Sequence, residues 1–210
     1  MSDARVAVLP YGDRALLVEL GSTDRVTAWT AALTEHPVPG VLDLVPAAET
    51  LLVVADDGVD VAALGKRLRA LGEPVPVAGR DGAPYVVEVP VRYDGPDLAD
   101  VAGLTGLSEE EVVEAHTGRA WRVAFGGFAP GFAYLVGGDE RLHVPRRESS
   151  RTKVPAGAVG LAGEFSGVYP RESPGGWQLI GTTGLAMWDL DRDPPALLRP
   201  GAEVRFVVAR

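Results

Sequence analysis

From Trp121 to the C-terminus, the sequence consists of short apolar runs interrupted by glycine and proline, with no helical period. Short runs bounded by turn residues are typical of β-strands, and glycine inside such a run marks a bend or a close backbone approach. A series of these runs without an amphipathic helix between them favours a closed or barrel-like β structure. This pattern therefore limits the fold more than any other feature of the chain.

The first 78 residues have a different pattern, because a helical segment follows each pair of strands. Ser22 or Thr23 is the expected N-cap of the first helix, and Asp60 is that of the second. The expected strands are Val6–Leu9, Ala15–Leu20, Val41–Pro46 and Thr50–Ala55, and the helices run to about Glu35 and Leu71. The segment from Gly72 to Pro84 is rich in glycine and proline and is the predicted linker. The predicted fold class is therefore α+β: a small N-terminal α+β domain over residues 1–78, followed by a β-barrel domain over residues 85–210.

Two short helices are expected between the linker and the barrel strands, after a strand over Tyr85–Tyr93. The first begins at Asp97 and ends near Gly103. The second opens with a capping box, in which the Ser108 side chain accepts a hydrogen bond from the backbone of Glu111 and the Glu111 carboxylate reaches back.

The composition excludes several classes of protein. Cysteine is absent, which excludes disulfides, thiolate metal sites and a cysteine nucleophile. The three histidines, His36, His116 and His143, lie far apart and match no zinc motif, so no metal site is expected. A net charge of −9 argues against a nucleic-acid partner. The sequence shows neither a secretory signal nor an apolar stretch of membrane-spanning length, so we expect a cytoplasmic protein without a membrane partner.

Basic residues gather between positions 141 and 153 of this acidic chain. A charge run of this kind is most often a solvated loop. The alternative is an anion site for a carboxylate or a phosphate, which arginine can bind in bidentate fashion. Ser150 and Lys153 also match the S-x-x-K pattern of a lysine-activated serine, although the companion motifs are missing. The members of the cluster are Arg141, Arg146, Arg147, Arg151 and Lys153.

Three segments rich in glycine contain or adjoin aromatic residues, a composition that suits a pocket. Glycine lets the backbone approach a ligand closely, but the same glycines are also consistent with tight corners of a barrel. The candidate pocket walls are Phe128, Phe132, Tyr134, Tyr169 and Trp177, and the glycines nearest to them in the pattern are Gly157, Gly175 and Gly176.

The run from Tyr85 to Phe206 resembles the family that comprises the B-type subunit of 5-oxoprolinase, allophanate hydrolase subunit 1 and the Kip-type kinase inhibitor. Weaker matches over Gly12–Ala15 and Pro39–Val41 extend the likeness over nearly the whole chain. The main landmarks, in chain order, are GF-x-PGF-x-YL over Gly127–Leu135, the pair Pro145-Arg146, VPAG over Val154–Gly157, G-V-Y-P over Gly167–Pro170, SPGGW over Ser173–Trp177 and L-I-G over Leu179–Gly181.

The resemblance implies a cyclophilin-like β-barrel after the smaller α+β domain. It also implies a homologous partner, subunit 2, which is similar to the C-type subunit of 5-oxoprolinase, and a third partner similar to its A-type subunit. Such complexes cleave the C–N bond of a small amide or lactam at the expense of ATP. The chain has no G-x-x-x-x-G-K-[ST] motif, so ATP, with Mg²⁺, is expected at a site that lies on a partner or is shared with it.

The same resemblance assigns roles to individual residues. Arg146, Arg151 and Lys153 are expected to clamp a phosphate or the substrate carboxylate. Backbone amides around Gly157, Gly175 and Gly176 are expected to hold developing oxyanion charge. His116 lies at a family-like position and is the candidate proton carrier.

The chain departs from the family pattern at three positions. Ser150 precedes Arg151 where members often carry proline, Phe165 replaces a glutamine, and Thr182 replaces an arginine. The loss of an amide and a cation leaves open a less anionic amide or a urea-like substrate. It also leaves open a Kip-type binding module, which inhibits a sensor histidine kinase and is not an enzyme. A peptidyl-prolyl isomerase would rest on fold analogy alone.

Overall fold

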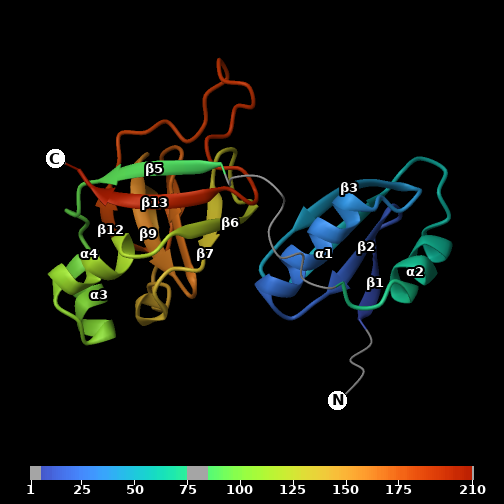
Figure 1. The fold of residues 1–210 in the computed structure, drawn as a ribbon, viewed down its shortest axis with the longest axis horizontal. Helices are drawn as coiled ribbons and strands as arrows, with labels where there is room; N and C mark the ends of the chain where they lie inside the picture. The colour runs from blue at the N-terminus through green and yellow to red at the C-terminus, as the bar shows by residue number, and fades with distance from the viewer. Residues whose placement is uncertain (1–5, 75–84, 210) are drawn as a thin grey trace. The chain divides into compact units, whose positions relative to one another are not determined.

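The computed structural model describes residues 6–74 and 85–209, which divide into two compact units on either side of the gap. The predicted end of the first domain, residue 78, lies outside the described residues, as does most of the predicted linker. The two units are described separately below (Figure 1).

The first unit is a four-stranded antiparallel sheet with two helices on one face. The strand order is β1-β2-β4-β3, so the two hairpins of the sequence pair through β2 and β4. Ser22 caps the first helix through a bond from Arg25 N, and Asp60 caps the second. The elements are β1 (Ala7–Tyr11), β2 (Ala15–Glu19), α1 (Thr23–Glu35), β3 (Val41–Pro46), β4 (Thr50–Ala55) and α2 (Val61–Ala70).

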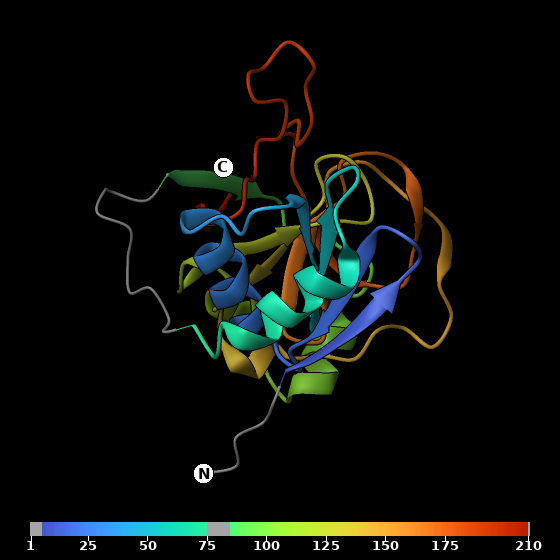
Figure 2. The same ribbon diagram turned by 90° about the vertical axis from the view of Figure 1, so that its right-hand side faces the viewer.

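Both helices pack on the same face of this sheet, α1 over β3 and β4 and α2 over β1 and β2. Figure 2 shows them next to each other. Alternation along the strands explains the burial, because every second residue of a strand points to the same side. On β4, Leu51, Val53 and Ala55 are buried beneath the helices, together with Trp29 of α1 and Leu64 of α2.

The opposite face of the sheet carries a row of apolar side chains across all four strands. Leu9 pairs with Leu17, Leu17 with Leu52, and Leu52 with Val45. The outer two members, Leu9 and Val45, are 44% and 45% exposed, and Tyr11 beside them is also exposed. This set is called the open sheet face below.

The second unit is built on a seven-stranded sheet in the order β12-β9-β10-β7-β6-β13-β5. Arg92, just after β5, forms a bridge with Thr182 at the end of β12, so the two edges of the sheet meet and the barrel is nearly closed. The elements are β5 (Val86–Val91), α3 (Leu98–Thr105), α4 (Glu109–Thr117), β6 (Trp121–Gly126), β7 (Ala133–Val136), the 3-10 turn η1 (Glu140–Leu142), β8 (Arg151–Val154), β9 (Ala158–Ala162), β10 (Phe165–Val168), β11 (Ser173–Gly175), β12 (Gln178–Thr182) and β13 (Glu203–Val208).

The barrel wall separates two apolar clusters. Every residue of β9 is buried, because both faces of this strand are covered. Val159 and Leu161 point into the main core, whereas Ala158 and Ala162 belong to a second cluster on the other side of the strand. The second cluster is rich in aromatic residues and is the foundation of the candidate site.

Two features lie outside the barrel sheet. Strands β8 and β11 pair with each other as a separate two-stranded sheet. The segment 183–202, between β12 and β13, is a long loop that stands out from the barrel (Figures 1 and 2). Among the helices of the described residues, none is both long and apolar enough to cross a membrane.

The predicted α+β class and barrel-like second part are confirmed, and the capping box at Ser108 is present with both of its hydrogen bonds. The end predicted for α3 is wrong by two residues. Gly103 lies inside the helix, and Gly106, at φ 74°, provides the left-handed residue that ends it.

Candidate functional site

A pocket of about 170 Å³ opens on the outer side of the barrel wall. Five aromatic side chains form half of its lining, together with one arginine, one serine and the Pro-Gly-Gly segment at the end of β11. The five aromatic residues, the arginine and both glycines were all predicted as site residues, and they come from segments far apart in the sequence. The lining residues are Phe128, Phe132, Tyr134, Arg146, Ser150, Tyr169, Pro174, Gly175, Gly176 and Trp177.

Phe132 is the centre of the aromatic wall. Its ring centroid lies 5.2 Å from that of Tyr134 and 5.3 Å from those of Tyr169 and Trp177, in edge-to-face geometry. Edge-to-face pairs at this distance add to the stability that burial provides. The wall is therefore rigid, except that Phe128 at its edge is 59% exposed.

Glycine is required where the aromatic rings meet the backbone. A Cβ on Gly167, in β10, would lie 3.1 Å from both the Phe132 and the Trp177 rings. A Cβ on Gly175 would lie 2.2 Å from the Tyr169 hydroxyl, which is impossible without a shift. These glycines therefore make room for the pocket wall, and Gly175 also lines the pocket; the close approach of its backbone to a ligand stays a prediction.

Arg146 is the cation of the pocket, and its charge is not balanced by an ion pair within the described residues. The other members of the basic cluster each have a carboxylate partner: Arg141 bonds Asp139, Arg147 and Arg151 bond Asp97, and Lys153 bonds Glu172. An arginine that lines a pocket beside aromatic side chains and lacks a carboxylate partner is suited to bind a small anion.

The two tyrosines of the pocket are neutral. Burial raises the pKa of both Tyr134 and Tyr169, and the positive charge of Arg146 opposes this shift without reversing it. The pocket lining thus includes two neutral phenols beside one positive charge, and the Tyr169 hydroxyl already bonds the Trp177 backbone.

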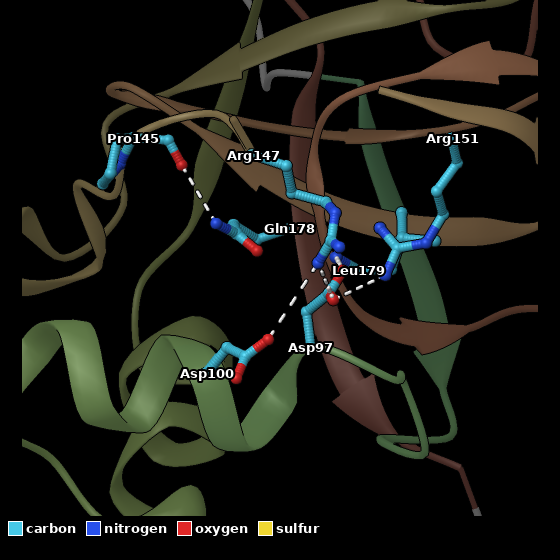
Figure 3. Close-up of polar contacts among 7 residues, drawn as sticks. All are labelled: Asp97, Asp100, Pro145, Arg147, Arg151, Gln178 and Leu179. Carbon is cyan, nitrogen blue, oxygen red and sulfur yellow. Dashed lines mark hydrogen bonds and ion pairs between the residues drawn. The ribbon is translucent and has the colours of Figure 1, made fainter. Parts of the chain in front are cut away.

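Asp97 is a buried carboxylate that binds two arginines of the basic cluster. Its carboxylate is 1% exposed, and its Oδ1 accepts hydrogen bonds from Arg147 Nη1 at 2.7 Å and Arg151 Nη2 at 2.6 Å. Its Oδ2 accepts from the Leu179 backbone N–H at 2.6 Å. Figure 3 shows the two guanidiniums meeting at this one side chain, with Asp100 4.0 Å from Arg147. Asp97 begins α3 as predicted, but its side chain makes no capping bond, because it is used here.

His116, the candidate proton carrier, does not lie at the pocket. It is fully buried in the barrel core, where its ring nitrogens contact Tyr93 Oη at 2.7 Å and Ser166 Oγ at 2.9 Å. Burial lowers the pKa of His116 to about 3, so the ring is neutral at physiological pH. With no exposed surface and both nitrogens engaged, this histidine cannot exchange a proton with a ligand in the pocket, and the catalytic role expected for it is corrected to a structural one.

The expected three-residue clamp is also corrected, because only Arg146 lines the pocket. Arg151 is bound to Asp97, and the Lys153 side chain is 76% exposed and bound to Glu172. Ser150 lines the pocket without Lys153, so the S-x-x-K pattern does not bring its two residues together there.

Gly157 has a structural role as well. Its backbone N–H donates to the Tyr169 carbonyl at 2.8 Å, and a Cβ on it would lie 2.2 Å from the Thr183 carbonyl. The amide is thus already used, and the oxyanion role expected for Gly157 is withdrawn. Gly175 and Gly176 do line the pocket, and their role stays a prediction.

Neither departure from the family pattern after residue 160 places a side chain in the pocket. Phe165 packs against Tyr134 at 5.4 Å between ring centroids, behind the wall. Thr182 donates to Asp94 Oδ1 at 3.1 Å, next to the bridge that closes the barrel. These substitutions therefore do not remove charge from the pocket lining itself.

The carboxylates that pair with the basic cluster were not predicted from the sequence. An excess of arginine between 146 and 151 signals that acidic partners are needed, but the partner Asp97 is some 50 positions away in the chain. Gln178 was missed as well: it is 6% exposed and donates from Nε2 to the Pro145 carbonyl at 3.3 Å.

The pocket is too small for the cofactor that the resemblance implies. Pockets for ligands of drug size enclose about 300–1,000 Å³, and a nucleoside triphosphate also needs several cations around its phosphates. A volume of about 170 Å³ with one unpaired guanidinium does not fit ATP. Within residues 6–74 and 85–209, no three His, Cys, Asp or Glu side chains are grouped so as to hold a metal ion.

Comparison with known proteins gives consistent results over most of the chain. A family described as the carboxyltransferase domain, subdomain C and D, matches residues 6–198. The chain is 43% identical to the B subunit of 5-oxoprolinase from Escherichia coli O157:H7, with 90% of this chain and 87% of that protein covered. It is 38% identical to the B subunit of 5-oxoprolinase from Bacillus subtilis (strain 168), with 97% and 92% covered.

The fold is similar to that of a longer protein of known structure. The crystal structure of TTHA0988 superposes with a TM-score of 0.76 at 39% sequence identity, and the match covers 94% of this chain. This chain spans only 40% of the length of that protein.

Proposed function

This chain belongs to the family of the carboxyltransferase domain, subdomain C and D, and on that premise we propose that it is the small subunit of an ATP-dependent hydrolase complex that cleaves amide or lactam C–N bonds. Its relatives named as B subunits of 5-oxoprolinase make 5-oxoproline the first candidate substrate. The name of a subunit implies a complex, and we assign the partner roles to a C-type and an A-type subunit.

The observation that carries this proposal is the unpaired guanidinium of Arg146 over an aromatic pocket of about 170 Å³. 5-Oxoproline is a small ring with one carboxylate and one amide. The ring can lie against Phe132 and Trp177, while Arg146 binds the carboxylate in bidentate fashion. The tyrosine hydroxyls then face the amide, which needs both a donor and an acceptor.

This chain's own part in the reaction is to bind and orient the substrate. ATP, with Mg²⁺, would supply the phosphoryl group that makes the amide carbon electrophilic, and we place its site on a partner or shared with one. Orientation alone can contribute much of a rate enhancement, because it converts a bimolecular encounter into a fixed geometry.

The proposal is tested in the assembled complex, by co-expression of this chain with its C-type and A-type partners and an assay of 5-oxoproline-dependent ATP hydrolysis. Arg146→Ala is expected to raise KM by roughly 10–100-fold, since a charge-assisted hydrogen bond contributes about 1.5–3 kcal/mol. Arg141→Ala is the matched control, because Arg141 is a neighbouring arginine outside the pocket. Equal KM values for the two variants would reject the carboxylate role of Arg146.

A second candidate function, the Kip-type binding module, is favoured by a different observation. The open sheet face of the first unit exposes Leu9, Tyr11 and Val45, as a protein-binding surface would. If purified wild-type chain lowers the autophosphorylation of a sensor histidine kinase and forms no complex that hydrolyses ATP, this alternative replaces the first.

A further inference from the structure

Residues of the segment 146–151 line two neighbouring cavities, the aromatic pocket and a second one next to α3. Arg146 and Ser150 line the aromatic pocket, whereas Arg147, Glu148 and Ser149 line a shallower hollow against α3. The segment must therefore be held in one conformation for Arg146 to face the aromatic wall.

The contacts that hold this segment do not involve the side chain of Arg146, and one of them is the pairing of Arg151 with Gly175 across β8 and β11. The side chains of Arg147 and Arg151 both bond Asp97, and the Arg147 backbone N–H donates to the Gly176 carbonyl at 2.8 Å. Just before the segment, the Pro145 carbonyl accepts from Gln178 Nε2 (Figure 3). Because the Asp97 carboxylate is 1% exposed, breaking its contacts with the two arginines would leave a buried charge uncompensated, which is costly.

The charges of this network balance. Asp97 and Asp100 contribute two negative charges, and Arg147 and Arg151 contribute two positive ones. Arg146 stands outside the network and retains its charge. Of the three arginines of this segment, Arg146 is thus the one without a carboxylate partner within the described residues.

We propose that Asp97 is the positioning and specificity-determining residue of the pocket: by binding Arg147 and Arg151, with Asp100 as the second carboxylate, it leaves Arg146 as the one unpaired arginine of the segment and makes the pocket prefer a monoanion. This inference rests on the proposed function in that the monoanion is the substrate carboxylate. A phosphate dianion would carry one charge more than the single guanidinium of Arg146 can balance, so we expect it to bind more weakly than a carboxylate.

The test uses the full chain and two readouts that do not depend on turnover. Calorimetry measures the affinity for inorganic phosphate at mildly alkaline pH, where the dianion dominates. Mass spectrometry measures how fast an arginine-selective dicarbonyl reagent modifies each arginine. In wild type, we expect weak phosphate binding and modification of Arg146 ahead of Arg147 and Arg151, because the last two are tied to Asp97.

Asp97→Asn keeps the size of the side chain and an acceptor for the Leu179 amide, but removes the charge. We expect it to bind phosphate about tenfold more tightly than wild type, since one more cation is left uncompensated at short range. Modification of Arg147 and Arg151 should rise toward the rate of Arg146. The double variant Asp97→Asn/Arg151→Gln restores the charge balance through the remaining Arg147–Asp100 pair, so its phosphate affinity should return toward that of wild type.

A second variant keeps the inference testable if Asp97→Asn fails to fold. Asp100 is 66% exposed, so Asp100→Asn is expected to fold and to tighten phosphate binding in the same direction by a smaller factor. Glu172→Gln is the matched control, because it frees Lys153, which does not line the pocket. Unchanged phosphate affinity and unchanged modification rates in folded Asp97→Asn, or unchanged affinity in Asp100→Asn, would overturn the proposal.

The two proposals fail in different ways. If wild type binds no 5-oxoproline, or binds it equally well in Arg146→Ala, the substrate assignment is wrong, while the phosphate and modification results still decide the role of Asp97. If Arg146→Ala abolishes 5-oxoproline binding but Asp97→Asn behaves as wild type toward phosphate, the substrate assignment stands and the role of Asp97 is rejected.

Discussion

At the scale of single residues, the environment of His116 decides what its chemistry can be. Phe206 stacks on the imidazole at 4.1 Å between ring centroids, and the hydroxyls of Tyr93 and Ser166 occupy the two nitrogens. In a neutral ring one nitrogen donates and the other accepts, so both hydroxyls are satisfied without a buried charge. The residue therefore makes the folded state sensitive to acid.

We expect the free energy of unfolding to fall as the pH is lowered below about 6.5, the ordinary pKa of histidine. His116 binds a proton below about pH 6.5 in the unfolded chain, but only near pH 3 in the folded chain, where burial lowers its pKa to about 3. Between these two pKa values, protonation of His116 in the unfolded chain lowers the free energy of unfolding by up to about 1.4 kcal/mol for each pH unit of acidification. Above about pH 6.5, His116 is neutral in both states and no longer changes the free energy of unfolding with pH.

Urea unfolding of wild type and His116→Gln over this pH range checks the sign. Glutamine can donate and accept but does not titrate, so the difference between the two slopes isolates His116 from the carboxylates. If the wild-type slope is no steeper than that of His116→Gln, His116 is not the buried neutral group described above.

Phe128 has a backbone conformation that is unfavourable for its residue type. Its φ is +65°, and the Ala129 N–H donates to the Gly127 carbonyl at 2.7 Å, which closes a three-residue turn around it. A positive φ costs an L-residue about 1–2 kcal/mol. Phe128→Gly is therefore expected to be more stable than Phe128→Ala by about 1 kcal/mol in urea unfolding.

Both Phe128 variants remove the same pocket wall, so both should weaken substrate binding to a similar degree. If the alanine variant is as stable as the glycine variant, the turn does not require a positive φ at residue 128.

At the scale of elements, α4 begins with a complete capping box. Ser108 Oγ accepts from the Glu111 N–H at 3.2 Å, and the Ser108 N–H donates to Glu111 Oε2 at 2.8 Å. Ser108→Ala is expected to lower the free energy of unfolding by about 1 kcal/mol, because an orphan N–H of the first turn loses its acceptor. Ser108→Thr keeps the acceptor and should lose much less, and equal losses in urea unfolding would show that the cap is not what stabilises this helix end.

Strand β9 shows why glycine and alanine alternate with larger residues in the barrel wall. Gly160 pairs with Gly167 of β10, and both leave room on the outer side for Trp177. Large side chains of the same strand face the core instead. A strand that is buried on both faces needs small side chains on the face against which aromatic rings pack.

At the scale of the whole molecule, each unit has its own core within the described residues. The first core is built only from residues 6–68, and the barrel core and aromatic cluster only from residues beyond 85. Asp97 and all of the pocket lining belong to the second unit. Residues 85–210 expressed alone are therefore expected to fold and to bind the same ligand as the full chain.

Near-ultraviolet circular dichroism and calorimetry of this fragment check the expectation. A fragment that lacks fixed aromatic signals, or that folds but has lost ligand affinity, would show that the site depends on the first unit.

Much of the fold followed from local pattern. Helix caps at Ser22, Asp60 and Ser108 were predicted correctly, because a cap is a contact between residues close together in the chain. The barrel-like class was predicted from turn residues between short apolar runs. The end of α3 was not, since glycine both interrupts and ends helices and only the backbone conformation separates the two cases.

The sequence by itself determined which residue types build the pocket, because aromatic and glycine residues recur in segments whose spacing allows no helix. Only the tertiary structure decided which cation is available. Arg146, Arg147 and Arg151 are chemically identical, and their roles differ because a carboxylate about 50 positions earlier in the chain binds two of them. Charge pairing of this kind depends on distances in space, which no local pattern encodes, and for the same reason His116 was expected at the site but lies in the core.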